Sequence, residues 1–191
     1  MRKPVLSMFM SLDGYVAGPD GEFLPPEWSA DVETYWSGYA LTRAGHLLYG
    51  RVNFLFNKAF WAAAETDPTS PAAGVSYAGT MNRLPKTVFS TTLAGDPGWN
   101  ASLAGRDLAG AVAGLKAGGG GDLLLFGGAL LARSFVAADL PDEYRLMVTP
   151  NLLGAGQRLF EPGFARLELE LTESRALDTG AVILHYHRKR S

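Results

Sequence analysis

The chain has 191 residues, a formal net charge of −2, no cysteine and 47% hydrophobic residues. This length and composition predict one globular domain over residues 1–191, with a core of its own. The absence of a dense basic run before residues 188–190 argues against nucleic-acid partners, and the absence of cysteine excludes disulfides and thiolate metal sites. No stretch approaches the roughly 18 unbroken apolar residues of a membrane span, and the first residues do not read as a signal peptide. We therefore expect a cytoplasmic protein without a membrane partner.

The first third of the chain alternates strands with helices. Residues 5–12 form a near-continuous apolar run, which predicts a strand buried on both faces, and Asp13 and Gly14 end it with a turn. After a Gly/Pro-rich loop we expect a helix from an N-cap at Ser29 to a stop at Gly45. The apolar stripe of this helix, at spacings typical of one helical face, consists of Val32, Tyr35, Trp36, Tyr39 and Ala40.

The alternation continues almost to the end of the chain, where it changes. The turn Asp178-Thr179-Gly180 joins two strands that have no helix between them, which is typical of a hairpin. We therefore expect an α/β fold of three α/β/α layers, with a mostly parallel mixed sheet and an antiparallel C-terminal hairpin. The expected strands are 46–50, 86–90, 122–126, 143–150, 165–177 and 181–189, and the expected helices are 51–64, 106–116 and 127–138.

One junction between a strand and a helix is rich in glycine. Phe126-Gly127-Gly128-Ala129-Leu130 leads from an apolar strand into a helical pattern. Glycines there leave backbone N–H groups bare, and the positive end of a helix dipole favours an anion such as phosphate. The alternative, which stays open, is that these glycines only let the helix pack closely on the sheet.

Two further strand ends carry groups that suit a nucleotide. In the segment Gly50-Arg51-Val52-Asn53 a glycine is followed by a guanidinium with a fork of donors for phosphate. Ser90, Thr91 and Thr92 place three hydroxyls where a ribose or its phosphate can be hydrogen-bonded, although a turn cap explains them equally well. Because ligands gather at the carboxyl ends of parallel strands, we expect the three junctions to form one site.

Known catalytic and metal motifs are sparse in this sequence. Neither a G-x-G-x-x-G fingerprint nor a Walker P-loop is present. Asp31 is the candidate acid or acceptor-orienting carboxylate, with Glu33 behind it, although either carboxylate also suits a helix N-terminus by its charge alone. His185 and His187 share one face of the last strand, with His46 as a possible third ligand, but the spacing matches no metal motif and we expect no metal.

The order of these segments resembles the reductase domain of the bifunctional riboflavin-biosynthesis deaminase-reductase. It is equally similar to the stand-alone, dihydrofolate-reductase-like proteins of that family. The chain has no cysteine for the zinc site of the deaminase, so the resemblance is to the reductase half. The segments that carry it are SLDGYVAGPDG (11–21), LLYGRVNF (47–54), KTVFSTTL (86–93), residues 120–160 and the closing LHYHR.

The resemblance implies a dihydrofolate-reductase-like fold with NADPH lying across the strand ends. It assigns Gly50–Asn53 and Phe126–Leu130 to the cofactor phosphates, Ser90–Thr92 to the adenosine ribose, and the loop from Asp13 to Ala17 to the nicotinamide. Asn53 stands where the family commonly has Thr, and Thr91 stands where many relatives have an Arg that suits a 2′-phosphate. The resemblance makes NADPH the expected cofactor, and because of these two departures NADH is not excluded.

The family implies an oxidoreductase that transfers a hydride to a small pterin-, flavin-precursor- or carbonyl-type acceptor, acting as a homodimer. The other interpretation is a nucleotide- or flavin-binding module of the same fold without turnover, because fold alone does not define function. Tyr35, Trp36 and Tyr39 are candidates to line the acceptor pocket, with core packing as the alternative for at least two of them.

Overall fold

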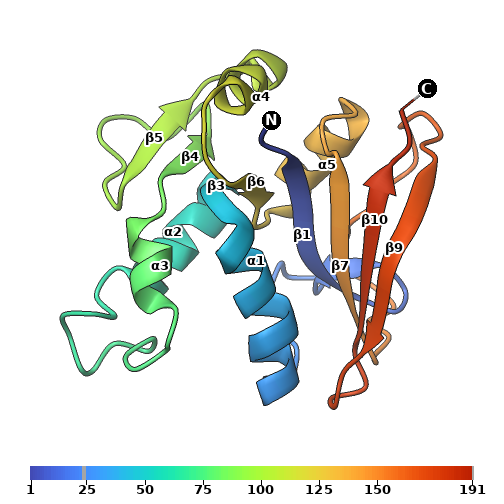
Figure 1. The fold of residues 1–191 in the computed structure, drawn as a ribbon, viewed down its shortest axis with the longest axis horizontal. Coiled ribbons are helices and arrows are strands. Elements are labelled where there is room, and N and C mark those ends of the chain that lie inside the picture. Colours follow the sequence, from blue (N-terminus) through green and yellow to red (C-terminus); the bar gives the residue numbers. More distant parts are fainter. Residues whose placement is uncertain (23–24, 191) are drawn as a thin grey trace.

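The computed structural model describes residues 1–22 and 25–190. A sheet of eight strands forms its centre (Figure 1). The strand order is β5-β4-β3-β6-β1-β7-β10-β9. All strands from β5 to β7 run parallel, and β10 is antiparallel to both of its neighbours. The strands are β1 (Pro4–Ser11), β3 (Ala44–Gly50), β4 (Lys86–Phe89), β5 (Ala101–Ala104), β6 (Asp122–Leu125), β7 (Glu143–Thr149), β9 (Leu169–Ala176) and β10 (Val182–Arg188).

Helices cover both faces of this sheet, so the three-layer α/β/α prediction is confirmed. Alternate residues of each strand point to opposite faces. Leu48 packs with residues of α4 (Leu108–Ala117) and α5 (Ala129–Ala137), whereas Leu47 packs with the helices of the other layer. That layer comprises α1 (Tyr39–Arg43), α2 (Arg51–Trp61) and α3 (Ala78–Arg83), together with the π-helix η1 (Val32–Gly38) that precedes α1.

The predicted N-cap is confirmed, but the first helix differs from the predicted regular α-helix. The Ser29 hydroxyl accepts the N–H of Val32 at 3.2 Å. The N–H of Tyr39 bonds to the carbonyl of Thr34, five residues back, which is the π-helical register. Arg145 of β7 donates to the carbonyls of Tyr35 and Trp36, so these oxygens are partly used outside the helix.

Three short strands were not predicted. β5 has four residues, and β2 (Tyr15–Ala17) pairs with β8 (Gln157–Arg158) in a separate two-stranded sheet. These segments are too short to show an alternation of apolar and polar residues. Helix α1 ends at Arg43 with Ala44 as its C-cap, so the predicted stop at Gly45 is the first residue after the cap and already lies within β3.

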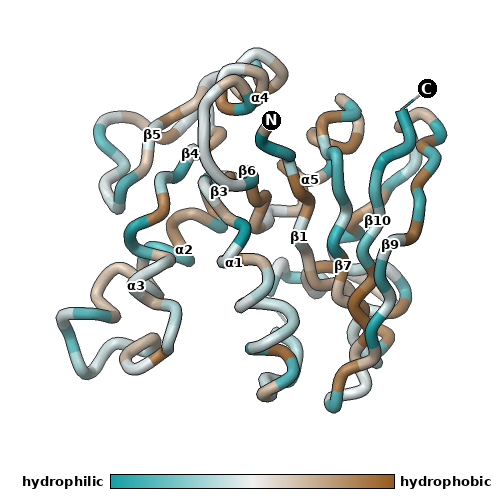
Figure 2. Tube along the Cα trace, viewed as in Figure 1, coloured by the Kyte–Doolittle hydropathy of each residue, from teal (hydrophilic) through white to brown (hydrophobic). Residues whose placement is uncertain are grey.

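The parallel strands define two edges of the sheet, which we call the carboxyl edge and the amino edge. The carboxyl edge holds the last residues of β5, β4, β3, β6, β1 and β7, and the amino edge holds their first residues. Figure 2 shows polar residues at the start of the chain and at the upper ends of β7 and β10, which belong to the amino edge. No helix in the described ranges is both long and apolar enough to span a membrane.

Candidate functional site

The structure brings the three predicted junctions together at the carboxyl edge. Gly50, the last residue of β3, pairs with Phe89 of β4, so Ser90 begins directly beside the start of α2. On the other side of β3, strand β6 leads into Gly127 and Gly128, and a Cβ on Gly128 would lie 3.9 Å from the Cα of Gly50. The three segments therefore form one continuous surface along neighbouring strands.

Both glycines of the β6–α5 junction are required by the backbone. Gly127 has φ +103° and Gly128 has φ +91°, a region that favours glycine. A Cβ on Gly127 would also lie 2.4 Å from Nδ2 of Asn53 and 3.3 Å from Sδ of Met8. The close-packing interpretation of these glycines is thus correct, and it is compatible with a ligand at the same turn.

Helices α2 and α5 begin at this edge without a capping side chain. Their N-cap residues are Gly50 and Gly128, and neither helix has a side-chain cap in the described structure. By contrast, the Asp107 carboxylate caps α4 by accepting the N–H of Gly110 at 2.8 Å. The first turns of two adjacent helices therefore present free N–H groups and positive dipole ends to the same place, which suits a diphosphate.

Asn53 holds the two junctions together. Its Nδ2 donates to the carbonyl of Phe126 at 2.9 Å, and its Oδ1 accepts from Asn57. Both polar ends of the Asn53 side chain thus have partners within the protein, and its backbone N–H belongs to the uncapped first turn of α2. The Asn at this position fixes the glycine turn against helix α2.

Exposed apolar side chains line the same edge. Four of them follow four neighbouring strands, and each is between 68% and 74% exposed. Two of the four lie in the first turns of α2 and α5, and the other two follow β1 and β7. They are Leu12, Val52, Leu130 and Leu152. This edge can pack against flat apolar groups as well as bind an anion.

The loop after β1 is fixed by one carboxylate. Oδ1 of Asp13 accepts from the Ser11 hydroxyl at 2.6 Å and from the Leu153 N–H at 3.1 Å, and Oδ2 accepts from the Gly154 N–H at 2.7 Å. The hydrogen bond from Ser11, followed by those from the backbone, lowers the pKa of Asp13 to about 2. Asp13 is thus a turn residue that ties the β1–β2 loop to the β7–β8 loop, and Ala17 lies beyond it in β2.

Asp31 lies at the start of the first helix, next to the hairpin turn. Its Oδ2 accepts the N–H of Asp178 at 3.1 Å, and it is partly buried. Of the three candidate aromatics, Trp36 is buried and packs on Phe9. The Tyr39 hydroxyl accepts from Arg43, and its ring lies against His185 with ring centroids 6.1 Å apart. Both of these rings therefore have the packing role that the sequence left open.

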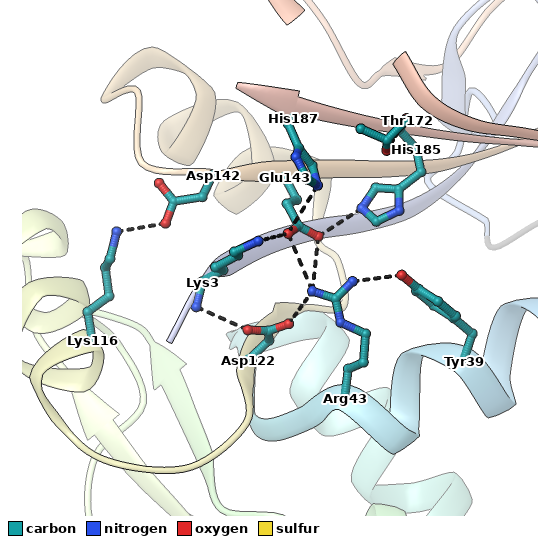
Figure 3. A network of polar contacts seen from close by, with 10 residues as sticks. All are labelled: Lys3, Tyr39, Arg43, Lys116, Asp122, Asp142, Glu143, Thr172, His185 and His187. Carbon is teal, nitrogen blue, oxygen red and sulfur yellow. Dashed lines mark hydrogen bonds and ion pairs between the residues drawn. The ribbon is translucent and has the colours of Figure 1, made fainter. Parts of the chain in front are cut away.

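The amino edge carries a different cluster, which Figure 3 shows from close by. The buried carboxylate of Glu143 accepts from Lys3 at 2.7 Å and from His185 at 2.8 Å, and it forms an ion pair with Arg43 at 3.2 Å. Arg43 also binds Asp122 at 2.7 Å. Burial pushes the pKa of Glu143 upward, but the hydrogen bonds from these three partners outweigh burial and hold it well below its usual range.

His46 does not join this cluster. Its ring bonds to the Thr87 hydroxyl at 2.8 Å. These two residues lie on β3 and β4, which are four and five positions away from β10 in the sheet order. The third group beside the two C-terminal histidines is Glu143, and ligand atoms of Glu143, His185 and His187 lie within 4.8 Å of one another. Because Lys3 and Arg43 already neutralise that carboxylate, we interpret the cluster as an ion network.

The fold is that of the dihydrofolate-reductase-like α/β proteins. Dihydrofolate reductase from Enterococcus faecalis, complexed with NADP(H), matches with a TM-score of 0.62 and 11% identity, covering 98% of this chain and 97% of that chain. A putative riboflavin biosynthesis protein from Shewanella sp. PV-4 matches with a TM-score of 0.73 and 24% identity, covering 98% of this chain and 99% of that chain.

The sequence also identifies the family. Residues 2–183 match the RibD C-terminal domain, and the chain belongs to that family. The protein named "Uncharacterized protein YyaP" of Bacillus subtilis (strain 168) is 28% identical over 187 residues, which cover 97% of this chain and 95% of that protein. The family and the fold both agree with the resemblance drawn from the sequence.

Proposed function

We propose that this protein is an NAD(P)H-dependent reductase that transfers a hydride to a small pterin-, flavin-precursor- or carbonyl-type acceptor. The observation that carries the proposal is the pair of uncapped helix N-termini, α2 and α5, which approach each other closely at Gly50 and Gly128. Family membership and the likeness to a reductase complexed with NADP(H) support the same function.

The residues present at the carboxyl edge fit a dinucleotide. Free N–H groups of two helices suit the diphosphate, and Arg51, exposed and at the first position of α2, adds a positive charge beside them. The apolar side chains Leu12 and Leu152 lie on the β1 and β7 side of the diphosphate position, where a flat nicotinamide and a flat acceptor can stack.

Such a reaction requires little acid–base chemistry from the protein. A bound reduced nicotinamide supplies the hydride, and the chain aligns the acceptor and keeps water away. Alignment alone lowers a barrier by on the order of 7 kcal/mol in favourable geometry. Asp31 is the proposed proton donor or acceptor-orienting carboxylate, because it lies at the end of the first helix nearest the carboxyl edge and one of its oxygens has no hydrogen-bond partner in the described structure.

The experiment is the oxidation of NADPH and NADH, followed by absorbance, with pterins, flavins, quinones and the riboflavin precursor as acceptors. Turnover with any acceptor supports the reductase. Calorimetric binding of the nucleotide without turnover across the panel supports the non-catalytic module, and no binding of either nucleotide contradicts the proposal. With an acceptor in hand, Asp31→Asn is expected to lower kcat at least tenfold with the nucleotide Kd unchanged.

A further inference from the structure

The ends of strands β3, β4 and β5 place two arginines on either side of a row of hydroxyls. Phe89, the last residue of β4, pairs with Gly50 of β3 on one side and with Ala104 of β5 on the other. The N–H of Ser90 donates to the carbonyl of Ala104 at 3.2 Å, which continues the register beyond the strand. Residues 90–92 therefore lie between Arg51, which follows Gly50, and Arg106, which comes two residues after Ala104.

Neither of these arginines has a partner in the described structure. Among the arginines of residues 1–22 and 25–190, the side chains without a hydrogen bond, an ion pair or a ring contact are those of Arg51, Arg83 and Arg106. Two of these three guanidinium groups lie at the carboxyl edge, and both residues are exposed. The carboxylate nearest in sequence, Asp107, accepts the N–H of Gly110 within its own helix, and no ion pair joins it to Arg106 among the described residues.

The hydroxyls between the arginines are available as donors. The Ser90 oxygen accepts the N–H of Thr92 at 3.2 Å and the N–H of Leu93 at 2.9 Å, so its own proton is free to be donated outward. Thr91 and Thr92 are exposed, and their hydroxyls have no partner among the described residues. Hydroxyl donors beside an unpaired guanidinium are suited to a phosphate monoester.

The two ends of the carboxyl edge differ in a way that orients a dinucleotide. On one side of the α2 and α5 N-termini, β4 and β5 end in hydroxyls and a cation. On the other side, the exposed side chains after β1 and β7 are Leu12 and Leu152. A phosphorylated adenosine suits the first side and a nicotinamide the second. The distance from the β3–β6 boundary to the β4–β5 boundary is two strand spacings, or about 10 Å.

We propose that Arg106 selects NADPH over NADH by binding the 2′-phosphate of the adenosine ribose, together with the hydroxyls of Ser90, Thr91 and Thr92. This inference rests on the proposed function. It also explains how a chain with Thr91 in place of the family's common Arg retains a cation for this phosphate, because strand β5 brings one from a different part of the sequence.

The test is calorimetric binding of NADPH and NADH to the full chain and to Arg106→Ala. We expect the unmodified chain to prefer NADPH. The substitution is expected to lower NADPH affinity by about 10- to 100-fold, the range for hydrogen bonds to a charged group, and to leave NADH affinity unchanged. Arg106→Lys is expected to restore part of the loss. Arg83→Ala, the third arginine without a partner, is the matched control and is expected to change neither affinity.

Two small probes separate the subsite from the rest of the cofactor. Adenosine 2′-monophosphate is expected to compete with NADPH better than adenosine 5′-monophosphate does, and to lose this advantage in Arg106→Ala. If both dinucleotides bind and their affinity ratio is unchanged by Arg106→Ala, the role of Arg106 is wrong while the proposed function stands. If neither dinucleotide binds the unmodified chain, the proposed function fails first.

Discussion

The two edges of the sheet are built from opposite kinds of residue. At the carboxyl edge, helices α2 and α5 begin at glycines with no capping side chain, and Arg51 and Arg106 have no counter-ion in the described chain. At the amino edge, the single carboxylate of Glu143 has ion-pair or hydrogen-bond contacts with four basic side chains, which are Lys3, Arg43, His185 and His187. The same parallel strands run from the amino edge, where charged groups have partners, to the carboxyl edge, where N–H and guanidinium groups have none among the described residues.

This difference separates stability from binding. Charged groups at the amino edge find their partners within the protein, so they contribute to folding. The N–H groups and guanidinium groups at the carboxyl edge have no partner in the chain, so a ligand can provide one. Four substitutions, taken from the largest expected effect to the smallest, test which groups contribute to stability and which to binding.

Removal of the Glu143 carboxylate is the strongest test of the amino edge. In Glu143→Ala, Arg43 and Lys3 lose a buried counter-ion, and the free energy of unfolding is expected to fall by about 3 kcal/mol or more. Urea unfolding measures this loss. Lys3→Ala is the control, because its side chain is 45% exposed and such pairs contribute less than about 1 kcal/mol. A loss of NADPH affinity in folded Glu143→Ala would show that the edges are coupled.

His46 should make the protein sensitive to acid. Burial, followed by the charges of Arg2 and Lys86, lowers the pKa of His46 to about 4 from the ordinary value of 6.5. Between pH 6.5 and pH 4 the unfolded chain binds the proton and the folded chain does not, so stability falls as the pH falls through this window. The loss amounts to about 3 kcal/mol at most.

The measurement is urea unfolding at pH 7, 5.5 and 4 for the unmodified chain and for His46→Gln. The glutamine does not titrate but can still hydrogen-bond to Thr87, the partner of His46. We expect the variant to lose less stability than the unmodified chain over this range. Equal losses in both proteins would assign the acid sensitivity to other groups.

A side-chain cap on α2 should lower the affinity for the nucleotide and raise the stability of the protein slightly. Gly50 has ordinary extended backbone, φ −81° and ψ 160°, and a Cβ there would lie 3.6 Å from the Cβ of Leu131, an ordinary contact. In Gly50→Asp the new carboxylate occupies the helix N–H groups, as Asp107 does in α4. NADPH affinity is expected to fall at least 100-fold, or about 2.7 kcal/mol, while stability rises by a few tenths of a kcal/mol.

The matched control for Gly50→Asp is Asp107→Ser, which changes the cap of α4 and not that of α2 or α5. This control is expected to leave the affinity for NADH unchanged. If Gly50→Asp binds NADPH as tightly as the unmodified chain does, the free N–H groups of α2 are not part of the site, and the carboxyl edge loses its main difference from the amino edge.

The sequence predicted the parallel strands and the C-terminal hairpin, because each is a long apolar or alternating run bounded by turn residues. It did not predict the π-helical turn, which depends on a contact between Arg145 and the carbonyls of Tyr35 and Trp36, more than 100 residues away in the chain. Strand β5, with only four residues, had no periodic signal of its own.

The sequence predicted the parts of the candidate site that are formed by glycine turns and by the ends of strands. It did not predict the parts that depend on which side chains pair with one another. Glycine turns and strand ends located Gly50, Ser90 and Gly127 on one edge. Arg106 was missed because β5 was missed, although Gly105-Arg106 before a helix repeats the pattern of Gly50-Arg51. The Glu143 network joins five separate segments, and no local pattern shows which acid meets which base.

Arg51 and Arg106 flank the same hydroxyls. The substitution with the smallest expected effect, Arg51→Ala, distinguishes their roles. Arg51 begins α2 beside the N–H groups proposed to bind the diphosphate, which NADPH and NADH share. In Arg51→Ala both affinities are expected to fall by about tenfold, or about 1.4 kcal/mol, with their ratio unchanged, whereas Arg106→Ala changes the ratio. Calorimetry with both nucleotides measures this, with Arg83→Ala as the control. A selective loss of NADPH binding in Arg51→Ala would place the 2′-phosphate on the α2 side of Ser90 and transfer the specificity role from Arg106 to Arg51.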